Sequence, residues 1–406
     1  MADLETVYNH IFALEYTQGF QSYDIYDGSG LNIPGLRRFR STRMVSTYFN
    51  KFSPVNFRKF LGISRRKYPH AVACMVNAYY NASVERVPAA FIREQVDWLL
   101  SASLIEKYGY HCWNGIGISI DMKQNTIDPG VPGLIGTSAV ARALAAYYKK
   151  TGDAGMPEVL RSVRDDIIQN YYQVYSGVSF FRYKPNTSPW QFTINASAKG
   201  AALVFHINHL LGENKGLDLA ESAVSSIINA QEADGRWKYT IDLKDGRHKE
   251  QADFHQAYII KSLLDIYETG LLEISVTNTV KEALVYQNTV QLQPSGALYY
   301  RHPRKYPYNI HNQLYAYFVN RMAGFLGVSN DWEKEADRIF KWTMKHLYSP
   351  EIGFIYGAYP GIKIKIPYLR WGNAHALYLF SILMNKLTGG ESEDSNTIEH
   401  AHVCTN

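Results

Sequence analysis

A repeat of helical hydrophobic patterns, with a period of about 60 residues, constrains the fold of this chain more than any other feature. Six segments carry small and apolar residues around most of a helical circumference, which is typical of helices buried on nearly all sides. These segments begin near Pro69, Leu134, Ala196, Asp253, Asn309 and Gly372. A glycine, the usual residue at a helix end, follows several of them, at Gly152, Gly212, Gly270, Gly327 and Gly389. We therefore predict six inner helices.

A second set of segments, which are amphipathic with charged faces, alternates with the first. These segments cover residues 4–18, 88–109, 156–175, 217–231, 273–287 and 330–348. Because each inner helix can bury its surface against an outer helix and against the next pair, the alternation predicts an all-α (α/α)6 toroid of six helical hairpins. We expect one barrel domain over residues 1–388 and a disordered polar tail over 389–406.

The returns from outer to inner helices are short and rich in glycine, aromatic and β-branched residues, which predicts small β-hairpins. They lie at residues 115–121, 178–183, 235–239, 296–300 and 353–356. Since each return leads into the start of an inner helix, we expect hairpins and helix starts to gather at one mouth of the barrel. Loops on a rigid scaffold are where functional residues usually lie.

Cysteine usage and the known short motifs exclude several classes of protein. Cys74, Cys112 and Cys404 form no CxxC pair, which argues against a disulfide framework or a zinc site and favours a reducing compartment. The N-terminus does not resemble a signal peptide and no segment is apolar enough to span a membrane, so we expect a cytoplasmic protein. No HExxH, Walker, GxGxxG or GxSxG motif occurs, so we predict neither cofactor, metal nor nucleic-acid partner.

Basic residues and tyrosines are both unevenly distributed. The net charge is +5 and there are 31 tyrosines. Arginines and lysines cluster at residues 37–43, 58–67 and 301–305. Such clusters either attract an anionic polymer or form an ordinary solvated face. The flat tyrosine ring with its polar tip suits contact with sugars as well as with interfaces.

Histidines near the starts of three successive inner helices are the main candidates for catalysis. They are His255, His311 and His375, and they converge if the barrel closes. An imidazole there can exchange protons near neutral pH. The alternative is that each histidine only caps a helix or bonds a neighbouring loop.

Carboxylates and tryptophans at the same mouth also have more than one interpretation. Asp253 either orients His255, serves as a general acid or base, or caps the helix. Asp24 and Asp27 either form the paired carboxylates of a glycosidase or stabilise a turn. Trp113, Trp237 and Trp371 either stack on sugar rings or pack the mouth.

Several short motifs carry resemblances to known families. Gln231–Trp237 matches the Q-x3-G-x-W repeat of terpene cyclases and their toroid relatives, but the DxDD and DDxxD motifs are absent, so a terpene cyclase is disfavoured. The ordered motifs YDIYDG, QEADGRWKY, DFHQAYII and RWGNAHALYLF resemble toroid-type bacterial exopolysaccharide-biosynthesis proteins. This resemblance implies a role in making or tailoring a surface polysaccharide, with the synthesis machinery as a partner.

The (α/α)6 architecture is also similar to that of polysaccharide lyases, unsaturated glucuronyl hydrolases and uronyl C5-epimerases. This similarity implies an acidic oligo- or polysaccharide as substrate and, for lyases and epimerases, removal of the proton at C5 of a uronate. Side chains suited to neutralise or hold such a substrate are Asn114, Asn195, Arg301, Arg370 and Asn373. Proton transfer is assigned to the histidines together with Tyr239, Tyr300 and Tyr308.

Three functions remain open at this point. The first is a uronate lyase or C5-epimerase. The second is a glycoside hydrolase, in which Asp24 or Asp27 faces Asp128 or Asp253. The third is a polysaccharide-binding or scaffold protein without catalysis, which would show aromatic side chains without coupled titratable groups.

Overall fold

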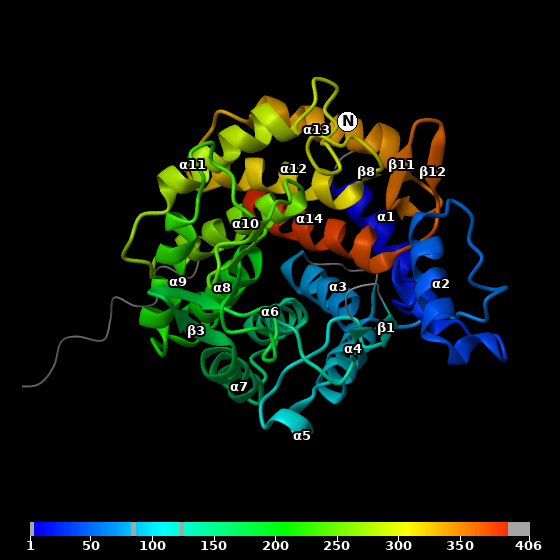
Figure 1. The fold of residues 1–406 in the computed structure, drawn as a ribbon, viewed down its shortest axis with the longest axis horizontal. Coiled ribbons are helices and arrows are strands. Elements are labelled where there is room, and N and C mark those ends of the chain that lie inside the picture. The colour runs from blue at the N-terminus through cyan, green and yellow to red at the C-terminus, as the bar shows by residue number, and fades with distance from the viewer. Residues whose placement is uncertain (1–3, 83–86, 122–125, 389–406) are drawn as a thin grey trace, which may run out of the picture.

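Six inner helices form a closed ring in the computed structural model, which describes residues 4–82, 87–121 and 126–388 (Figure 1). Each inner helix packs against the next, and α14 packs against α3 to close the ring. The inner helices are α3 (Pro69–Asn81), α6 (Leu134–Thr151), α8 (Ile194–Leu211), α10 (Phe254–Glu268), α12 (Ile310–Phe325) and α14 (Asn373–Leu387). The predicted (α/α)6 toroid is confirmed, and the helices begin close to the predicted positions. Gly389 and the predicted tail lie outside the described residues.

The outer helices cover the ring, one on each inner helix. They are α1 (Leu4–Thr17), α4 (Ala89–Ser101), α7 (Met156–Asp166), α9 (Leu217–Asn229), α11 (Thr277–Tyr286) and α13 (Glu333–Leu347). The N-terminal helix α1 packs on α14, so the two ends of the described chain complete one hairpin pair. The predicted outer helices over residues 88–109 and 156–175 are longer than the helices in the structure. The first ends at Ser101 and is followed by the short α5 (Ile105–Tyr108), and the second passes through a π-turn into a strand.

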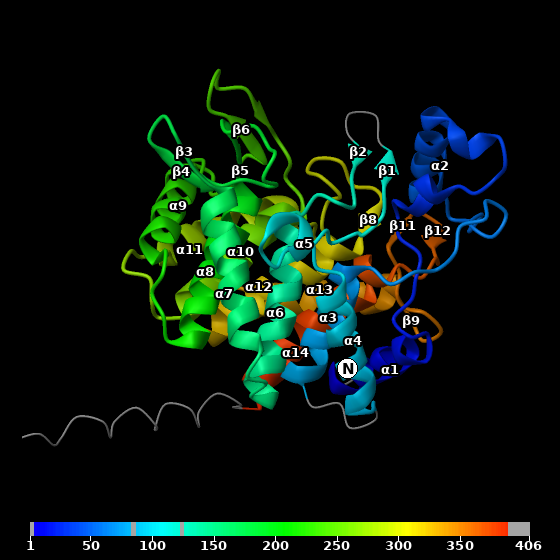
Figure 2. The ribbon, with the colours of Figure 1, turned by 90° about the horizontal axis from the view of Figure 1, so that it is seen from below.

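Short antiparallel strands connect the helices. They are β1 (Ile120–Asp121), β2 (Thr126–Ile127), β3 (Tyr172–Tyr175), β4 (Val178–Phe181), β5 (Gln191–Thr193), β6 (Thr240–Asp242), β7 (His248–Lys249), β8 (Tyr308–Asn309), β9 (Tyr348–Ser349), β10 (Gly353–Phe354), β11 (Gly357–Tyr359) and β12 (Ile362–Ile364). The sheets are β1–β2, β3–β4, β5–β6–β7, β8–β11–β12 and β9–β10. Figure 2 shows β1–β2, β3–β4 and β5–β6 at one end of the helix ring. Ser176 and Gly177, both with positive φ, form the turn between β3 and β4, as a tight hairpin requires.

Polar side chains in the first turns of five inner helices bind the backbone of the preceding return. Gln256 shows the pattern: its Oε1 accepts from the amide of Trp237 at 2.8 Å, and its Nε2 donates to the carbonyl of the same residue at 2.7 Å. The equivalent side chains are Thr137, Ser197, Asn312 and Asn373. These bonds satisfy buried backbone groups, so much of the polar character at the helix starts is structural.

The Q-x3-G-x-W motif has the same structural purpose. Gln231 Nε2 donates to the carbonyls of Gly235 and Thr279, each at 2.9 Å, and thereby ties the return to the start of α11. Trp237 is buried and its Nε1 donates to the carbonyl of Ile227 at 2.9 Å. The motif therefore stabilises the toroid rather than supplying chemistry.

Gly136→Ala should destabilise the protein by about 1–3 kcal/mol, although alanine is the better helix former. A Cβ on Gly136 of α6 would lie 2.3 Å from the amide nitrogen and 2.5 Å from the Cα of Gly115, which are backbone atoms that cannot rotate away. Urea unfolding measures the change. The matched control is Gly324→Ala in α12, where the nearest atom lies at 3.5 Å. A neutral Gly136→Ala would show that α6 and the return do not pack this closely.

The segment between α1 and α3 contains elements that the sequence analysis did not predict. They are the 3₁₀ turns η1 (Asp27–Gly30) and η2 (Leu36–Arg38) and the helix α2 (Arg40–Phe52). Figures 1 and 2 show this segment as a lobe at the edge of the ring. Within the described residues, no helix has the length and apolar character needed to cross a membrane.

Candidate active site

Side chains from five inner helices meet at the axis of the ring. The rings of His311 and His375 lie 4.4 Å apart and those of His70 and His375 lie 5.0 Å apart, between centroids. Tyr315 Oη lies 2.7 Å from Nδ1 of His375, and the Tyr315 ring packs against Tyr258 at 4.3 Å. We call this group, with Lys199 above the Tyr258 ring, the central cluster: His70, Lys199, Tyr258, His311, Tyr315 and His375.

Asp253 and His255 form a hydrogen-bonded pair beside the central cluster. Asp253 is the N-cap of α10, where its Oδ1 accepts from the amide of His255 at 3.1 Å. The same oxygen lies 2.5 Å from Nδ1 of His255. The same carboxylate therefore caps the helix and contacts the imidazole that it was predicted to orient. Phe254 joins this pair to the cluster, with its ring 4.3 Å from His255 and 5.4 Å from His311.

The second oxygen of Asp253 is held by neighbouring donors. Gln251 Nε2 donates to it at 2.9 Å and Arg301 Nε at 3.2 Å. Burial alone would raise the pKa of Asp253, but the charges of His255 and Arg301 and the hydrogen bonds from His255 hold that pKa below its ordinary value. Because Asp253 stays ionised, it favours a proton on Nδ1 of His255, so that Nε2 is the proton acceptor whenever the imidazole is neutral.

The imidazoles of the central cluster are neutral near physiological pH. Burial lowers the pKa of His311 to about 3, although the Trp371 carbonyl, 3.0 Å from Nδ1, works in the opposite direction. Burial, with nearby positive charge, also lowers the pKa of His70 and His375 well below the ordinary value. The cluster therefore presents uncharged nitrogen atoms that can accept or relay a proton.

Lys199 is a half-buried lysine in the second turn of α8. Burial, followed by the charges of Lys261 and Arg142, lowers its pKa to about 7. Lysines whose pKa is lowered by burial in this way commonly act in proton transfer. Lys199 can therefore exchange a proton with a bound molecule at neutral pH.

The stability of the protein should rise with pH between about pH 7 and about pH 10, and Lys199→Met should reduce that rise. The unfolded chain keeps the proton on Lys199 up to its ordinary pKa of 10.5, whereas the folded chain loses it near pH 7. Each unit of pH across this window then adds at most about 1.4 kcal/mol. Thermal unfolding over a pH series measures the slope. Lys341→Met, at an exposed position, is the control, and equal slopes in all three proteins would contradict the shifted pKa.

Several predicted substrate contacts surround these groups. The Tyr239 ring lies 4.8 Å from His255, and the Trp371 ring lies 4.7 Å from His311. The guanidinium of Arg301 lies 5.6 Å from the Tyr300 ring, and about half of the Arg301 side chain is exposed. These four residues remain candidates for holding a substrate.

Asp24 and Asp27 are both engaged by buried arginines. Arg370 binds the carboxylate of Asp24 through Nε at 2.7 Å and Nη2 at 2.9 Å. Arg58 Nε binds both oxygens of Asp27, at 2.8 and 2.9 Å. Asp24 also accepts from the amide of Tyr26 at 3.0 Å, as the turn interpretation predicts. In this arrangement the two aspartates and Arg370 support the fold beside the site.

Other predicted site residues have structural partners. Trp113 is fully buried and its Nε1 donates to the carbonyl of Leu99 at 2.7 Å. Asn114 uses its amide in four bonds within its own loop. Asn373 binds the amide of Phe354 and the carbonyl of Ile352. Together with Trp237, described above, these residues hold the returns in place.

Two further predicted site residues, Tyr308 and Asn195, differ in their positions relative to the central cluster. Tyr308 packs against Trp342 of the outer helix α13 at 4.8 Å, so its ring lies away from the central cluster. Asn195 lies one turn before Lys199, and its buried Oδ1 has no hydrogen-bond partner among the residues that the structure describes. Asn195 thus stays a candidate for a substrate contact.

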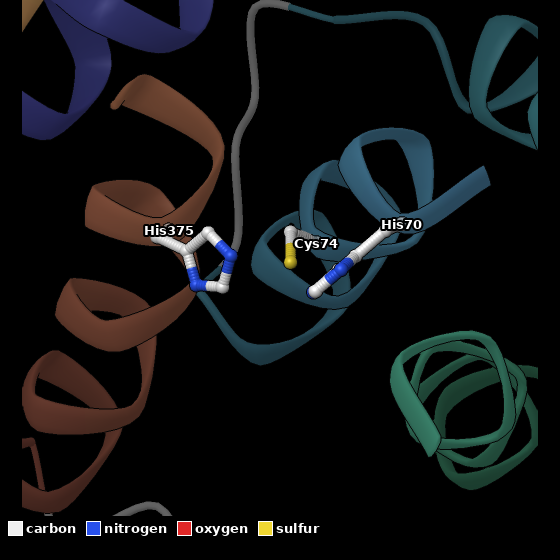
Figure 3. A group of neighbouring side chains, drawn as sticks. All are labelled: His70, Cys74 and His375. Carbon is white, nitrogen blue, oxygen red and sulfur yellow. The ribbon is translucent and has the colours of Figure 1, made fainter. Parts of the chain in front are cut away.

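His70, Cys74 and His375 place three possible metal-ligand atoms close together, all within 4.8 Å of one another (Figure 3). Figure 3 shows the first two on one helix and His375 facing them from another. Burial raises the pKa of the Cys74 thiol to about 12, so the sulfur keeps its proton at neutral pH, and a cation bound there would have to displace that proton. The charge of Arg370 nearby also disfavours a divalent cation.

The sequence analysis missed Lys199, His70, Tyr258 and Tyr315. Lys199 could have been noticed from the sequence, since it is the only charged residue in the stretch from Ile194 to Phe205. A single charge on a buried helix needs a partner or a function. The other three carried no comparable signal, because histidine and tyrosine also occur in ordinary cores.

Comparisons with known proteins identify the fold. No protein-family model and no curated protein matches the sequence. Solved structures match at low identity: the GH76 α-mannanase BT2949 of Bacteroides thetaiotaomicron (12% identity, 95% of this chain and 96% of that chain, TM-score 0.59) and the cellobiose 2-epimerase of Spirochaeta thermophila (14%, 80% and 87%, 0.58). A D-mannose isomerase also matches (12%, 79% and 87%, 0.60). The chain shares the (α/α)6 fold with these carbohydrate-active enzymes, and their different reactions show that the fold does not determine the chemistry.

Proposed function

We propose that the protein is a carbohydrate-active enzyme that removes a proton from a sugar carbon next to a carboxylate, as a uronate C5-epimerase or lyase does. The observation that carries this proposal is the Asp253–His255 pair, with a half-exposed arginine on its carboxylate and three neutral imidazoles nearby. An oriented imidazole is a suitable base for such a proton. The resemblance to toroid-type exopolysaccharide proteins would place this reaction in polysaccharide biosynthesis.

His255 acts as the base in the proposed reaction. Its Nε2 takes the proton from C5, while Asp253 stabilises the resulting imidazolium through Nδ1. In an epimerase, a second group returns a proton to the opposite face of the same carbon. In a lyase, it protonates the leaving oxygen at C4. Lys199 and the Tyr315–His375 pair are the candidates for this second group.

Cationic side chains beside the pair are suited to a uronate carboxylate. Arg301 uses Nε on Asp253, and its side chain remains half exposed, so its other nitrogen atoms can bind an anion. Lys51 lies close by and donates to the hydroxyl of Tyr26 at 3.3 Å. Positive charge at this position lowers the free energy of the enolate that forms when C5 loses its proton.

The arrangement gives less support to the two alternatives. The predicted hydrolase pairs two carboxylates, whereas Asp24 and Asp27 are bound by arginines and Asp253 by His255 and Arg301. The fourth carboxylate, Asp128, accepts from the amide of Gly130 at 2.8 Å within its own loop. A protein that only binds polysaccharide needs no interacting titratable groups. The site nevertheless contains the Asp253–His255 pair and Lys199, whose pKa is lowered.

Proton exchange tests the proposal directly. The protein is incubated in D₂O with uronate-containing oligosaccharides, and deuterium at C5 is followed by NMR together with the ultraviolet absorbance of an unsaturated uronate. Deuterium without absorbance indicates epimerisation, and absorbance indicates elimination. New reducing ends without either signal would overturn the proposal in favour of hydrolysis.

A second candidate reaction is proton removal at C2 of a reducing sugar, as in 2-epimerisation or aldose–ketose isomerisation. The neutral imidazoles of the central cluster favour it, since an uncharged sugar needs no cationic partner. Structural neighbours include a cellobiose 2-epimerase and a D-mannose isomerase. Arg301→Gln separates the candidates, because it should raise KM for a uronate by about tenfold or more and leave KM for a neutral sugar unchanged.

A further inference from the structure

Helix α2 is packed with its polar side inward. Ser46, Thr47 and Asn50 are buried, and Thr47 Oγ1 lies 2.7 Å from the hydroxyl of Ser29. The contact is close, because a Cβ on Gly28 would lie 2.5 Å from the backbone of α2. The orientation of the helix is therefore fixed by its polar face.

The opposite face of α2 is apolar and exposed. Val45, Tyr48, Phe49 and Phe52 follow the spacing of one helix face, and their exposed fractions are 63%, 42%, 52% and 38%. The chain on either side of α2 also exposes Leu36, Phe39, Val55 and Phe60, the last by 80%. These eight side chains, here called the α2 patch, are half of the sixteen large apolar side chains that are exposed in the described ranges. Such a concentration marks an interaction surface.

The segment that carries the α2 patch is strongly basic. Residues 28–82 contain ten arginines and lysines and no aspartate or glutamate, while the whole chain has a net charge of only +5. The exposed members are Arg37, Arg38, Arg40, Lys59, Arg65 and Arg66. Positive charge around an apolar face is complementary to a partner that is both anionic and apolar.

We propose that the α2 patch docks on an anionic lipid membrane. Phenylalanine, valine and leucine side chains can enter the boundary between headgroups and acyl chains, while the surrounding arginines bind lipid phosphates. The segment that carries the α2 patch forms a lobe at the edge of the ring (Figures 1 and 2), and a segment at the edge can approach a membrane without the ring in between. An acidic polysaccharide in solution would favour tyrosine and tryptophan platforms, and the patch contains only one such residue, Tyr48.

Docking would bring the candidate active site close to the membrane. Lys51 of α2 donates to Tyr26, and the Tyr26 ring lies 6.0 Å from Trp371, which contacts His311. The docking proposal rests on the surface alone and does not depend on the reaction proposed above.

Vesicle co-sedimentation of the full chain tests the docking proposal. We expect binding to vesicles that contain phosphatidylglycerol, weaker binding at high salt, and little binding to phosphatidylcholine alone. The double variant F49S/F60S should lower the partition coefficient by about tenfold or more, since each buried aromatic side chain contributes that order of affinity. R37Q/R38Q should lose the preference for anionic lipid.

The controls use exposed apolar residues elsewhere. V285S on α11 and I362S on β12 should bind vesicles like the unchanged protein, and circular dichroism should show all variants folded. Equal vesicle binding by F49S/F60S, or no binding by the unchanged protein, would overturn the proposal. A dimer in solution that F49S/F60S dissociates would overturn it in favour of a second copy of the chain.

Discussion

His255→Ala should lower kcat/KM by about 100- to 10,000-fold without unfolding the protein. The imidazole is the only one in the described residues that combines a buried carboxylate on Nδ1 with partial exposure of its ring, 15% of the side chain. Removing it deletes the proposed base but no core contact of comparable size. The rate of deuterium exchange into the substrate and the circular dichroism spectrum measure the two effects.

Asp253→Asn separates the catalytic from the structural role of the aspartate. Asparagine is as good an N-cap as aspartate, so α10 should keep its stability. An amide, however, carries no charge to hold the proton on Nδ1 of His255, and the wrong tautomer should reduce turnover by a similar factor. His346→Ala, on the outer helix α13, is the matched histidine control. Unchanged turnover in both His255→Ala and Asp253→Asn would remove the pair from the mechanism.

Asp24→Ala should destabilise the fold by about 3–5 kcal/mol, the largest stability loss that we expect from a single substitution. Asp24 is fully buried and binds the guanidinium of Arg370 with two hydrogen bonds. The substitution leaves Arg370 charged, buried and without this carboxylate. Urea or guanidinium unfolding measures the loss as a lower midpoint.

Two comparisons show whether the buried ion pair causes that loss. Asp24→Leu combined with Arg370→Met removes both charges and should be less destabilising than Asp24→Ala alone. Asp97→Ala breaks the exposed Arg93–Asp97 pair, whose side chains are 50% and 57% exposed, and should cost less than about 1 kcal/mol. Equal losses for Asp24→Ala and Asp97→Ala would show that Asp24 is not held as described.

Much of the fold could be predicted because the burial of a helix determines which residue types occur along that stretch of sequence. A helix buried on all sides shows apolar residues at every turn, so Pro69–Asn81 and its five counterparts were recognisable along the chain. The helix α2 shows the opposite case, in which the periodicity is present but does not reveal which face is buried. Its apolar face is exposed and its polar face is buried, so its pattern gives no information about the ring.

The candidate site could be predicted only in part. The convergence of His255, His311 and His375 followed from the repeat, because equivalent positions of successive inner helices meet at the axis. The roles of Trp113, Asn114, Asn373 and the two aspartates did not follow. Each of them has a side chain that could bind a ligand. Only the structure shows that it instead bonds to a neighbouring return or to a buried arginine.

The periodic pattern of apolar residues alone thus determined the toroid, its hairpin order and the meeting of the inner helix starts, since each of these depends on which residues avoid water. The tertiary structure alone decided which polar groups remain available for chemistry. Asp24 meets an arginine 346 positions away, and Lys199 acquires its lowered pKa from burial, followed by charges on α6 and α10. Hydrogen bonds and charges act over a few ångströms in space, and such distances exist only after the ring has closed.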